Sequence, residues 1–157
     1  MFRPIRRAKR AISQEKAEQL LLNEKRGVLA LNGDDGYPFA IPVNYFYDIG
    51  SKKIYFHGAK SGHKVDALKK SDKVCFTVYG GERFEEGQWA PYVCSTVVFG
   101  RCRMIDDPAV VEPKIRQLAA KYYPDMAEAE IEIARSLGAA MLYEITAEHI
   151  SGKQVQE

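Results

Sequence analysis

The stretch from residue 57 to residue 64 gathers side chains that suit anion binding. Lys60, His63 and Lys64 lie around the predicted start of a helix at Ser61 or Gly62. Free N–H groups and the positive end of the helix dipole favour an anion at such a start. Cations placed there are locally unfavourable unless an anion sits between them and the amides. Conflicts of this kind are typical of functional sites, and a phosphate is the natural anion.

A plainer interpretation of the same residues is that Lys60 and Lys64 are solvated surface lysines. The spacing of Gly58, Gly62 and Lys64 lacks the residue order of a Walker phosphate loop, so that motif is excluded. His57, His63 and His149 are scattered along the chain, which gives little support to a protein-ligated metal site.

A second stretch, residues 40–45, is suited to the flat part of a ligand. Pro42 cannot donate to a β-ladder, and this frees nearby backbone groups for a planar heterocycle. Asn44 offers both an acceptor and donors. Taken alone, the stretch is better explained as an ordinary bulged edge strand with Asn44 near the surface.

A mainly β domain must position these two stretches. Ser13 is typical of an N-cap, and the helix that follows is predicted to stop at Gly27. Pro113 is predicted to break or restart a later helix, because proline lacks the backbone N–H. We expect strands at 28–31, 37–47, 53–57, 73–79, 92–105 and 141–146, helices at about 14–26, 61–70, 107–123 and from 124 onward, a loop at 80–91, and a polar tail at 151–154.

The links between these strands set the expected topology. Most are too short for parallel crossovers, so the sheet should be mainly antiparallel. About six strands with Gly and Pro kinks predict a small closed barrel with helices outside it, an α+β fold. We expect a basic arm at residues 1–12 and one domain at residues 13–157.

Charge and cysteine content exclude several classes of protein. The net charge of +2 divides into five basic residues and no acid in the first ten positions, and 18 basic against 21 acidic residues in the rest. That balance argues against a nucleic-acid binder, although the arm itself could touch an anionic surface, lie in solvent or pack on an acidic partner subunit. No apolar run is long enough to cross a membrane. Three cysteines without C-x-x-C spacing suit a reducing cytoplasm.

An ordered set of short motifs then resembles a known family. These motifs are Gly33-Asp34-Asp35-Gly36-Tyr37-Pro38, Pro42-Val43-Asn44-Tyr45, Ile54-Tyr55-Phe56-His57, Gly62-His63-Lys64-Val65-Asp66-Ala67-Leu68, Val98-Phe99-Gly100-Arg101 and His149-Ile150-Ser151-Gly152-Lys153-Gln154. Together they resemble the pyridoxamine 5'-phosphate oxidase-like FMN-binding split barrels, specifically the nitroimidazole-resistance branch. The resemblance implies a six-stranded antiparallel split β-barrel with flanking helices, forming a homodimer with FMN at the subunit interface.

The resemblance also implies roles for individual residues. Ile41, Pro42, Val43 and Asn44 would run along the isoalloxazine ring, and Phe56 and His57 would lie beneath the ring and the ribityl chain. Lys60, Ser61, His63 and Lys64 would hold the phosphate. Ser95 of the partner subunit would contact the flavin, and Trp89, Tyr92 and residues 152–154 would cover the site.

Departures from the family pattern narrow the expected activity. The true oxidases have an Arg-Lys pair where this chain has His63-Lys64, and a tryptophan and an arginine near the C-terminus. Here the only tryptophan is Trp89 and the last arginine is Arg135, so oxidation of pyridoxamine phosphate is not expected.

The leading hypothesis is an FMN-dependent oxidoreductase. It would take reducing equivalents from NAD(P)H or another donor and pass them to an electron-poor small molecule such as a nitroaromatic. His57 or His63 is the choice if a side chain aids protonation. The alternative is a flavin- or haem-binding module that stores or senses its ligand without turnover.

Overall fold

Every strand pairing is antiparallel, as the short links predict. The computed structural model describes residues 1–156. The strands are β1 Ala11–Ile12, β2 Arg26–Asn32, β3 Pro38–Asn44, β4 Phe46–Asp48, β5 Lys53–Ala59, β6 Lys73–Arg83, β7 Tyr92–Ile105 and β8 Ala140–Gln154. The helices are α1 Gln14–Asn23, α2 His63–Lys70, α3 Pro108–Tyr122 and α4 Met126–Ser136, with single 3₁₀ turns at Ala8–Arg10, Asp34–Gly36 and Leu137–Ala139.

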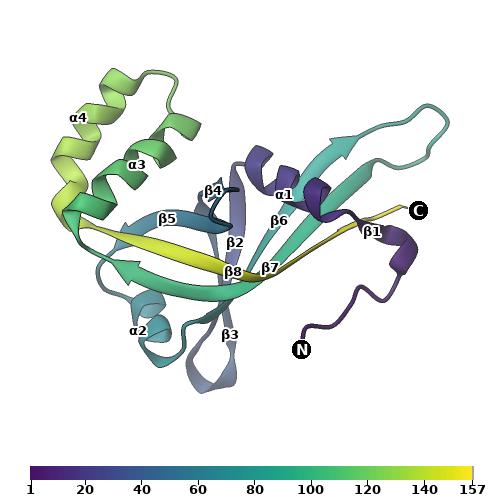
Figure 1. Cartoon of the computed structure of the whole chain (residues 1–157), viewed down its shortest axis with the longest axis horizontal. Coiled ribbons are helices and arrows are strands. Elements are labelled where there is room, and N and C mark those ends of the chain that lie inside the picture. The colour runs from purple at the N-terminus through teal and green to yellow at the C-terminus, as the bar shows by residue number, and fades with distance from the viewer. Residues whose placement is uncertain (157) are drawn as a thin grey trace.

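The sheet curls into a split barrel. Its hydrogen-bonded order is β3-β2-β6-β7-β8-β5-β4, with β1 added against β8 (Figure 1). The two ends of this order, β3 and β4, are consecutive in the chain and joined through Tyr45 alone. The barrel is therefore closed by the covalent chain at Tyr45, and β3 and β5 are free to diverge beyond that point.

Eight strands replace the predicted six for two local reasons. The predicted extended segment 37–47 bends at Tyr45 and so counts as both β3 and β4. The two-residue β1 comes from the basic arm, with Ala11 opposite Lys153 and Ile12 opposite Gly152. The split-barrel class itself is confirmed.

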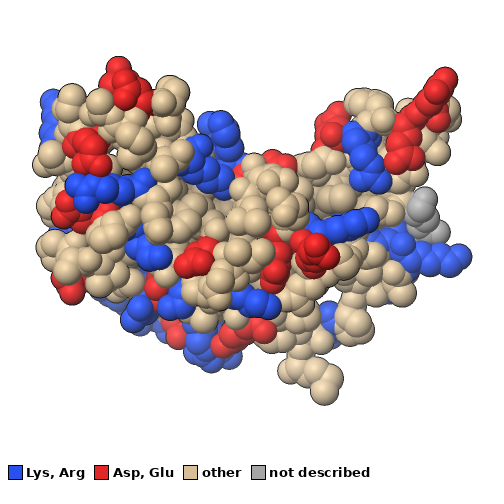
Figure 2. Space-filling view, turned by 45° about the horizontal axis from the view of Figure 1, so that its top comes forward, with Lys and Arg blue, Asp and Glu red and all other residues tan. Residues whose placement is uncertain are grey.

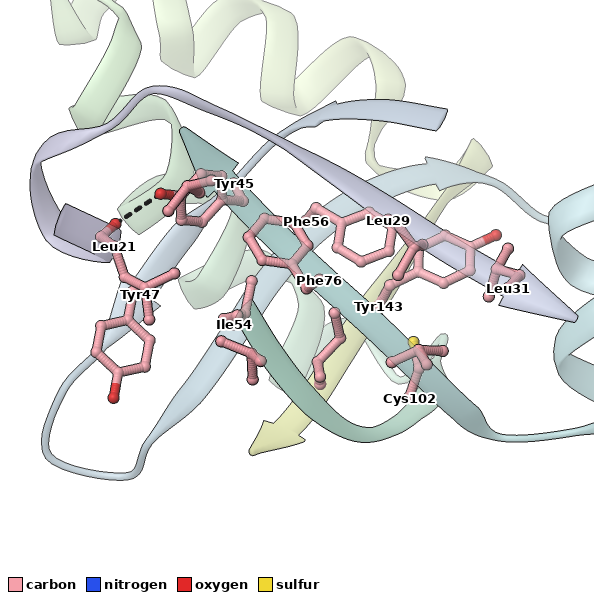
Figure 3. Packing of buried hydrophobic residues seen from close by; sticks show 14 of the residues in the cluster. Leu21, Leu29, Leu31, Tyr45, Tyr47, Ile54, Phe56, Phe76, Cys102 and Tyr143 are labelled. Atoms are coloured by element: carbon pink, nitrogen blue, oxygen red, sulfur yellow. Dashed lines mark hydrogen bonds between the residues drawn. The ribbon is translucent and has the colours of Figure 1, made fainter. Parts of the chain in front are cut away.

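Aromatic rings fill the barrel interior. Phe56 and Tyr143 stack with their centroids 4.8 Å apart, and Tyr45 meets Phe76 edge-on at 4.8 Å (Figure 3). Gly27 lies in β2, where a Cβ atom would come within 2.2 Å of the Phe76 ring. The prediction that Gly27 stops the first helix is wrong, because α1 ends at Asn23 and this glycine instead makes room for a core ring.

The α3–α4 pair packs outside the barrel, against the ends of β5 and β8. A second apolar cluster joins Tyr55 and Leu142 to the helices. The predicted break at Pro113 does not occur: α3 runs through it. Proline there removes one backbone bond, but both Ala109 and Pro113 are exposed, so water can satisfy the freed carbonyl.

The C-terminal segment is sheet and not the predicted polar tail. Residues 151–154 continue β8, with Ser151 opposite Val97 and Gly152 opposite Thr96. A Cβ on Gly152 would approach Ala17 and Ile12 to 2.8 Å, so this glycine lets α1 and β1 pack closely. The predicted loop 80–91 also begins later, because β6 continues to Arg83 past a bulge.

The basic arm packs on its own sheet. The Phe2 ring stacks on His149 at 4.8 Å and on Phe99 at 5.5 Å, between centroids. On the face seen in Figure 2, basic and acidic side chains are interspersed, with a notch between the α3–α4 pair and the β6–β7 hairpin. In residues 1–156 no helix combines the length and apolar character needed to cross a membrane.

Candidate functional site

A hollow of about 480 Å³ opens where β3 and β5 diverge. Its volume lies in the range of small-molecule sites. Its lining comes from the start of β2, the second half of β3, the end of β5 and the start of α2: Arg26, Ile41, Pro42, Val43, Asn44, His57 and Lys64. The structure therefore brings together six residues that the sequence nominated from two separate stretches, and adds Arg26.

β3 forms one wall of the hollow as an edge strand. It has only β2 as a hydrogen-bonded neighbour, so its outer edge presents backbone groups that no strand pairs. Pro42 lies opposite Val28, at an edge where proline is tolerated. Asn44 is exposed at the end of the strand. The edge position is as predicted, but the β2–β3 register runs from Arg26–Asn44 to Asn32–Pro38 without the predicted bulge. The outer edge leaves polar backbone groups available to a flat ligand.

Lys64 places a half-buried ammonium group at the hollow. Its Nζ lies 4.2 Å from the Tyr143 ring centroid and 5.3 Å from that of Phe56. Burial lowers the pKa of Lys64, and within residues 1–156 no carboxylate forms an ion pair with it. The two ring faces supply only part of the stabilisation that a half-buried cation needs, which favours an external anion.

Gly58 makes this position of Lys64 possible. A Cβ at Gly58 would lie 2.6 Å from Lys64 Nζ and 3.3 Å from Tyr143 Cε2. The absent side chain thus leaves a trough in which the lysine folds back from α2 over β5.

The start of α2 lacks a capping side chain. Its N-cap, Gly62, has φ of 116° and makes no side-chain bond, whereas Ser13, Asp107 and Asp125 cap the other α-helices. The first bond of the helix ladder is from Asp66 N–H to the Gly62 carbonyl, so the preceding N–H groups stay outside the ladder. This start has the free donors that an anion requires.

His63 turns away from the hollow toward the β2–β3 turn. Its ring stacks on Phe39 at 4.0 Å, and its Nε2 lies 3.5 Å from Asp34 Oδ2. Asp34 also accepts from Lys70 Nζ at 2.7 Å, and that hydrogen bond is the main cause of the lowered pKa of Asp34. Lys60 and Ser61 are exposed in the preceding turn and do not line the hollow. The predicted phosphate contacts of these three residues stay predictions.

His57 lies across the hollow from Asn44. Desolvation by neighbouring protein atoms, with the positive charge of Lys64 as a second cause, lowers the pKa of His57. The lowered pKa favours the neutral imidazole, which offers one donor and one acceptor.

Three nominated residues lie away from the hollow. Phe56 has no exposed surface and packs against Tyr143 beneath Lys64, so it does not line the hollow, and its predicted place beneath the ring stays a prediction. Ser95 lines a separate groove on the outer face of β7, beside Val97 and Phe99. Trp89 is 92% exposed at the β6–β7 hairpin. Within one chain, neither Ser95 nor Trp89 reaches the hollow.

Arg26 is the lining residue that sequence reasoning missed. It pairs with Asn44 in the β2–β3 ladder. Counting the register outward from the turn at Asp34–Gly36 would have placed this arginine beside Asn44. The described residues contain no group of three or more His, Cys, Asp or Glu that could hold a metal ion.

The chain is an antiparallel split barrel with a hollow between its diverging strands. These features are typical of barrels that bind small molecules. Residues 13–154 match the family model described as pyridoxamine 5'-phosphate oxidase. The chain belongs to that family, which confirms the predicted relationship. No curated protein matches the chain.

Solved structures share this fold at low sequence identity. A proposed 5-nitroimidazole antibiotic resistance protein from Bacteroides thetaiotaomicron matches with a TM-score of 0.77 and 17% identity, over 92% of this chain and 86% of that one. Flavocytochrome Anf3 from Azotobacter vinelandii matches with a TM-score of 0.77 and 21% identity, over 98% and 73%. An FAD-binding protein from Mycobacterium smegmatis matches with a TM-score of 0.64 and 17% identity, over 94% and 98%.

Proposed function

We propose that the chain binds FMN in the hollow along β3 and works as an FMN-dependent oxidoreductase. NAD(P)H would be the electron donor, and an electron-poor small molecule such as a nitroaromatic the acceptor. The protein would act in the cytoplasm, in keeping with three free cysteines. Family membership and flavin-binding proteins of the same fold support this proposal.

The half-buried Lys64 is the observation that carries the proposal. It lies at the start of the uncapped helix α2, with no acid to neutralise it among residues 1–156. A phosphate between the ammonium and the free N–H groups would satisfy both. The donor set therefore fits the phosphate of FMN, and the volume of the hollow suits a ligand of that size.

Other lining residues would orient the flat part of the ligand. The outer edge of β3 offers backbone donors and acceptors along Ile41–Asn44, and Asn44 adds its amide. Neutral His57 can donate or accept one hydrogen bond from the opposite wall. When bound, FMN supplies two-electron transfer, by which a nitro group takes up two electrons and two protons and loses water. The protein would position both partners.

Ser95 and Trp89 enter this proposal through a second copy of the chain. Both lie away from the hollow of their own chain. In a homodimer, the partner would supply them to cover the ligand, as the family resemblance implies.

FMN titration of Lys64→Ala tests the proposal. Loss of a charge-assisted phosphate contact should weaken FMN binding by about 10- to 100-fold. Lys69→Ala is the matched control, because Lys69 is an exposed lysine at the other end of the same helix. It should change affinity by less than about twofold. The measurement is quenching of FMN fluorescence, with the visible spectrum of the purified protein beside it.

Three results separate the possible outcomes. A wild-type protein that does not bind FMN removes the proposal altogether. Equal effects of the two lysine variants leave a flavin protein but remove the assigned phosphate contact. Tight binding without NAD(P)H-dependent reduction of a nitroaromatic identifies the storage or sensing module instead.

A further inference from the structure

A second pocket adjoins the hollow on the side of the helices. It has a volume of about 150 Å³, and its lining residues come from α3 with its C-cap Tyr123, α4, the end of β3 and the second half of β5. Asn44 and His57 line both spaces. A molecule in the pocket and a molecule in the hollow therefore contact the same two side chains, one on each strand of the split.

The walls of the pocket that come from the helices are apolar. Leu118 and Ala119 of α3 face Ile133 of α4 across it. Tyr122 contributes its ring, because its hydroxyl already accepts from the Tyr45 N–H at 2.8 Å and contacts the Lys25 carbonyl.

Two further polar side chains on the helix side, Ser136 and Glu132, have partners within α4. The Ser136 hydroxyl donates to the Glu132 carbonyl at 2.7 Å. The Glu132 carboxylate lies at the exposed rim, 3.5 Å from Arg135. Tyr123 adds a hydroxyl at the exposed rim, and Asn44 and His57 supply the hydrogen-bonding groups at the end of the pocket next to the hollow. Because Glu132 is paired with Arg135, the rim offers no unpaired charge to a charged ligand.

The size of the pocket limits the ligand to a single ring. An apolar cavity of about 150 Å³ in another protein accommodates one benzene molecule. A two-ring system would require the helices to separate.

We propose that this pocket binds the acceptor substrate, and that the substrate is an uncharged, single-ring aromatic molecule. Its ring lies between α3 and α4, and its polar, reducible substituent points to Asn44 and His57, at the edge of the hollow. This inference rests on the proposed function, because it names the substrate class of the same site.

Filling the pocket from its rim tests the inference. Ser136 is exposed and its hydroxyl bonds only within α4, so Ser136→Phe places a ring in the pocket at little cost to folding. Ala134→Phe is the control, because Ala134 is exposed on the same helix and does not line the pocket. The probe is benzamide, a redox-inert single ring with one polar group. Its binding is measured by isothermal titration calorimetry on the FMN-loaded and the FMN-free protein.

Benzamide affinity should fall by about tenfold or more in Ser136→Phe and stay unchanged in Ala134→Phe. FMN affinity should be equal in all three proteins, and the KM for nitrobenzene should rise with the loss of benzamide binding. Equal benzamide affinity in wild type and Ser136→Phe, or no binding to wild type, overturns the inference while FMN binding stands. If wild type does not bind FMN but its benzamide affinity still falls in Ser136→Phe, the proposed function is overturned and the assignment of the pocket to a single-ring ligand stands.

A second variant covers the case in which Ser136→Phe does not fold. Tyr123 lines the pocket and is 46% exposed. Tyr123→Ala should enlarge the space, weaken benzamide and strengthen 2-naphthamide, a two-ring analogue. An unchanged preference between the two probes would overturn the inference.

Discussion

At the residue scale, the position of the Lys64 ammonium depends on a side chain that is absent. Lys64 reaches the Tyr143 ring only by crossing the space above Gly58. An added Cβ there would meet the flexible end of the lysine at 2.6 Å, and the Tyr143 ring only at 3.3 Å. The flexible lysine can move aside easily, and the Tyr143 ring needs to shift by only a few tenths of an ångström. The expected consequence is a displaced charge in a protein that still folds.

Gly58→Ala should therefore separate ligand binding from stability. We expect FMN affinity to fall by about tenfold because the phosphate contact is lost, while the free energy of unfolding changes by less than about 1 kcal/mol. Gly138→Ala is the control, since nothing lies within 4 Å of a Cβ at that position. FMN titration and urea denaturation of the same samples measure both quantities. A large loss of stability with unchanged affinity would contradict this account of Gly58.

At the scale of elements, the sequence predicted what local chemistry determines. Ser13 caps α1 as expected, with its hydroxyl accepting from Lys16 N–H, and α2 buries Val65 and Leu68 as its apolar spacing predicts. The start of α2 beside Lys64 was also predictable, because strand, turn and helix follow directly in the chain.

Features that depend on distant partners were not predictable. Gly27 looks like a helix stop until Phe76, far away in the sequence, is seen to occupy the space above it. Residues 151–154 look like a tail because their strand partners lie on β7 and β1. In each case tertiary contacts override a local signal.

The buried Glu144 carboxylate makes hydrogen bonds and an ion pair that connect three strands. Glu144 of β8 is 4% exposed and accepts from Tyr55 Oη at 2.9 Å and Arg103 Nε at 2.7 Å, with Lys53 Nζ at 3.1 Å. Burial alone would raise the pKa of Glu144, but the hydrogen bonds from Arg103, Tyr55 and Lys53 outweigh it and hold the pKa below its ordinary value of 4.5. The charged form therefore stabilises the fold above pH 4.5, and this stabilisation is lost as the pH falls through the lower folded pKa.

Glu144→Gln should cost about 1–3 kcal/mol of unfolding free energy at pH 7. The difference in unfolding free energy between wild type and variant should become smaller as the pH falls below 4.5, because wild-type Glu144 then becomes protonated. Glu148→Gln on the same strand is the control; its exposed pair with Arg101 should be worth less than about 1 kcal/mol. Urea denaturation across pH 3.5–7 measures both, and a gap that is constant over this range would show that the charge of Glu144 is not the cause.

At the scale of the whole molecule, the outer face of β7 is where a second copy of the chain would contribute. Ser95, Val97 and Phe99 alternate on this face with the buried Thr96 and Val98. The groove there has apolar side chains at its base with Arg3, Arg6 and Lys153 also in its lining, and Phe99 stays 39% exposed although Phe2 stacks on it. Exposed apolar side chains with a charged rim are typical of association surfaces. The homodimer that the family resemblance implies would cover it and bring Ser95 to the hollow of the partner.

Val97→Glu should disrupt that dimer, because a carboxylate without a partner is costly at a buried interface. We expect a monomer by sedimentation velocity, and FMN affinity reduced by about tenfold or more, because half of each site would be missing. Ile131→Glu is the control: Ile131 is 67% exposed on α4, away from the groove, and its replacement should leave both dimer and FMN binding intact. A wild-type protein that is monomeric and binds one FMN per chain at full affinity would contradict the shared site, since Ser95 and Trp89 could not then reach the ligand.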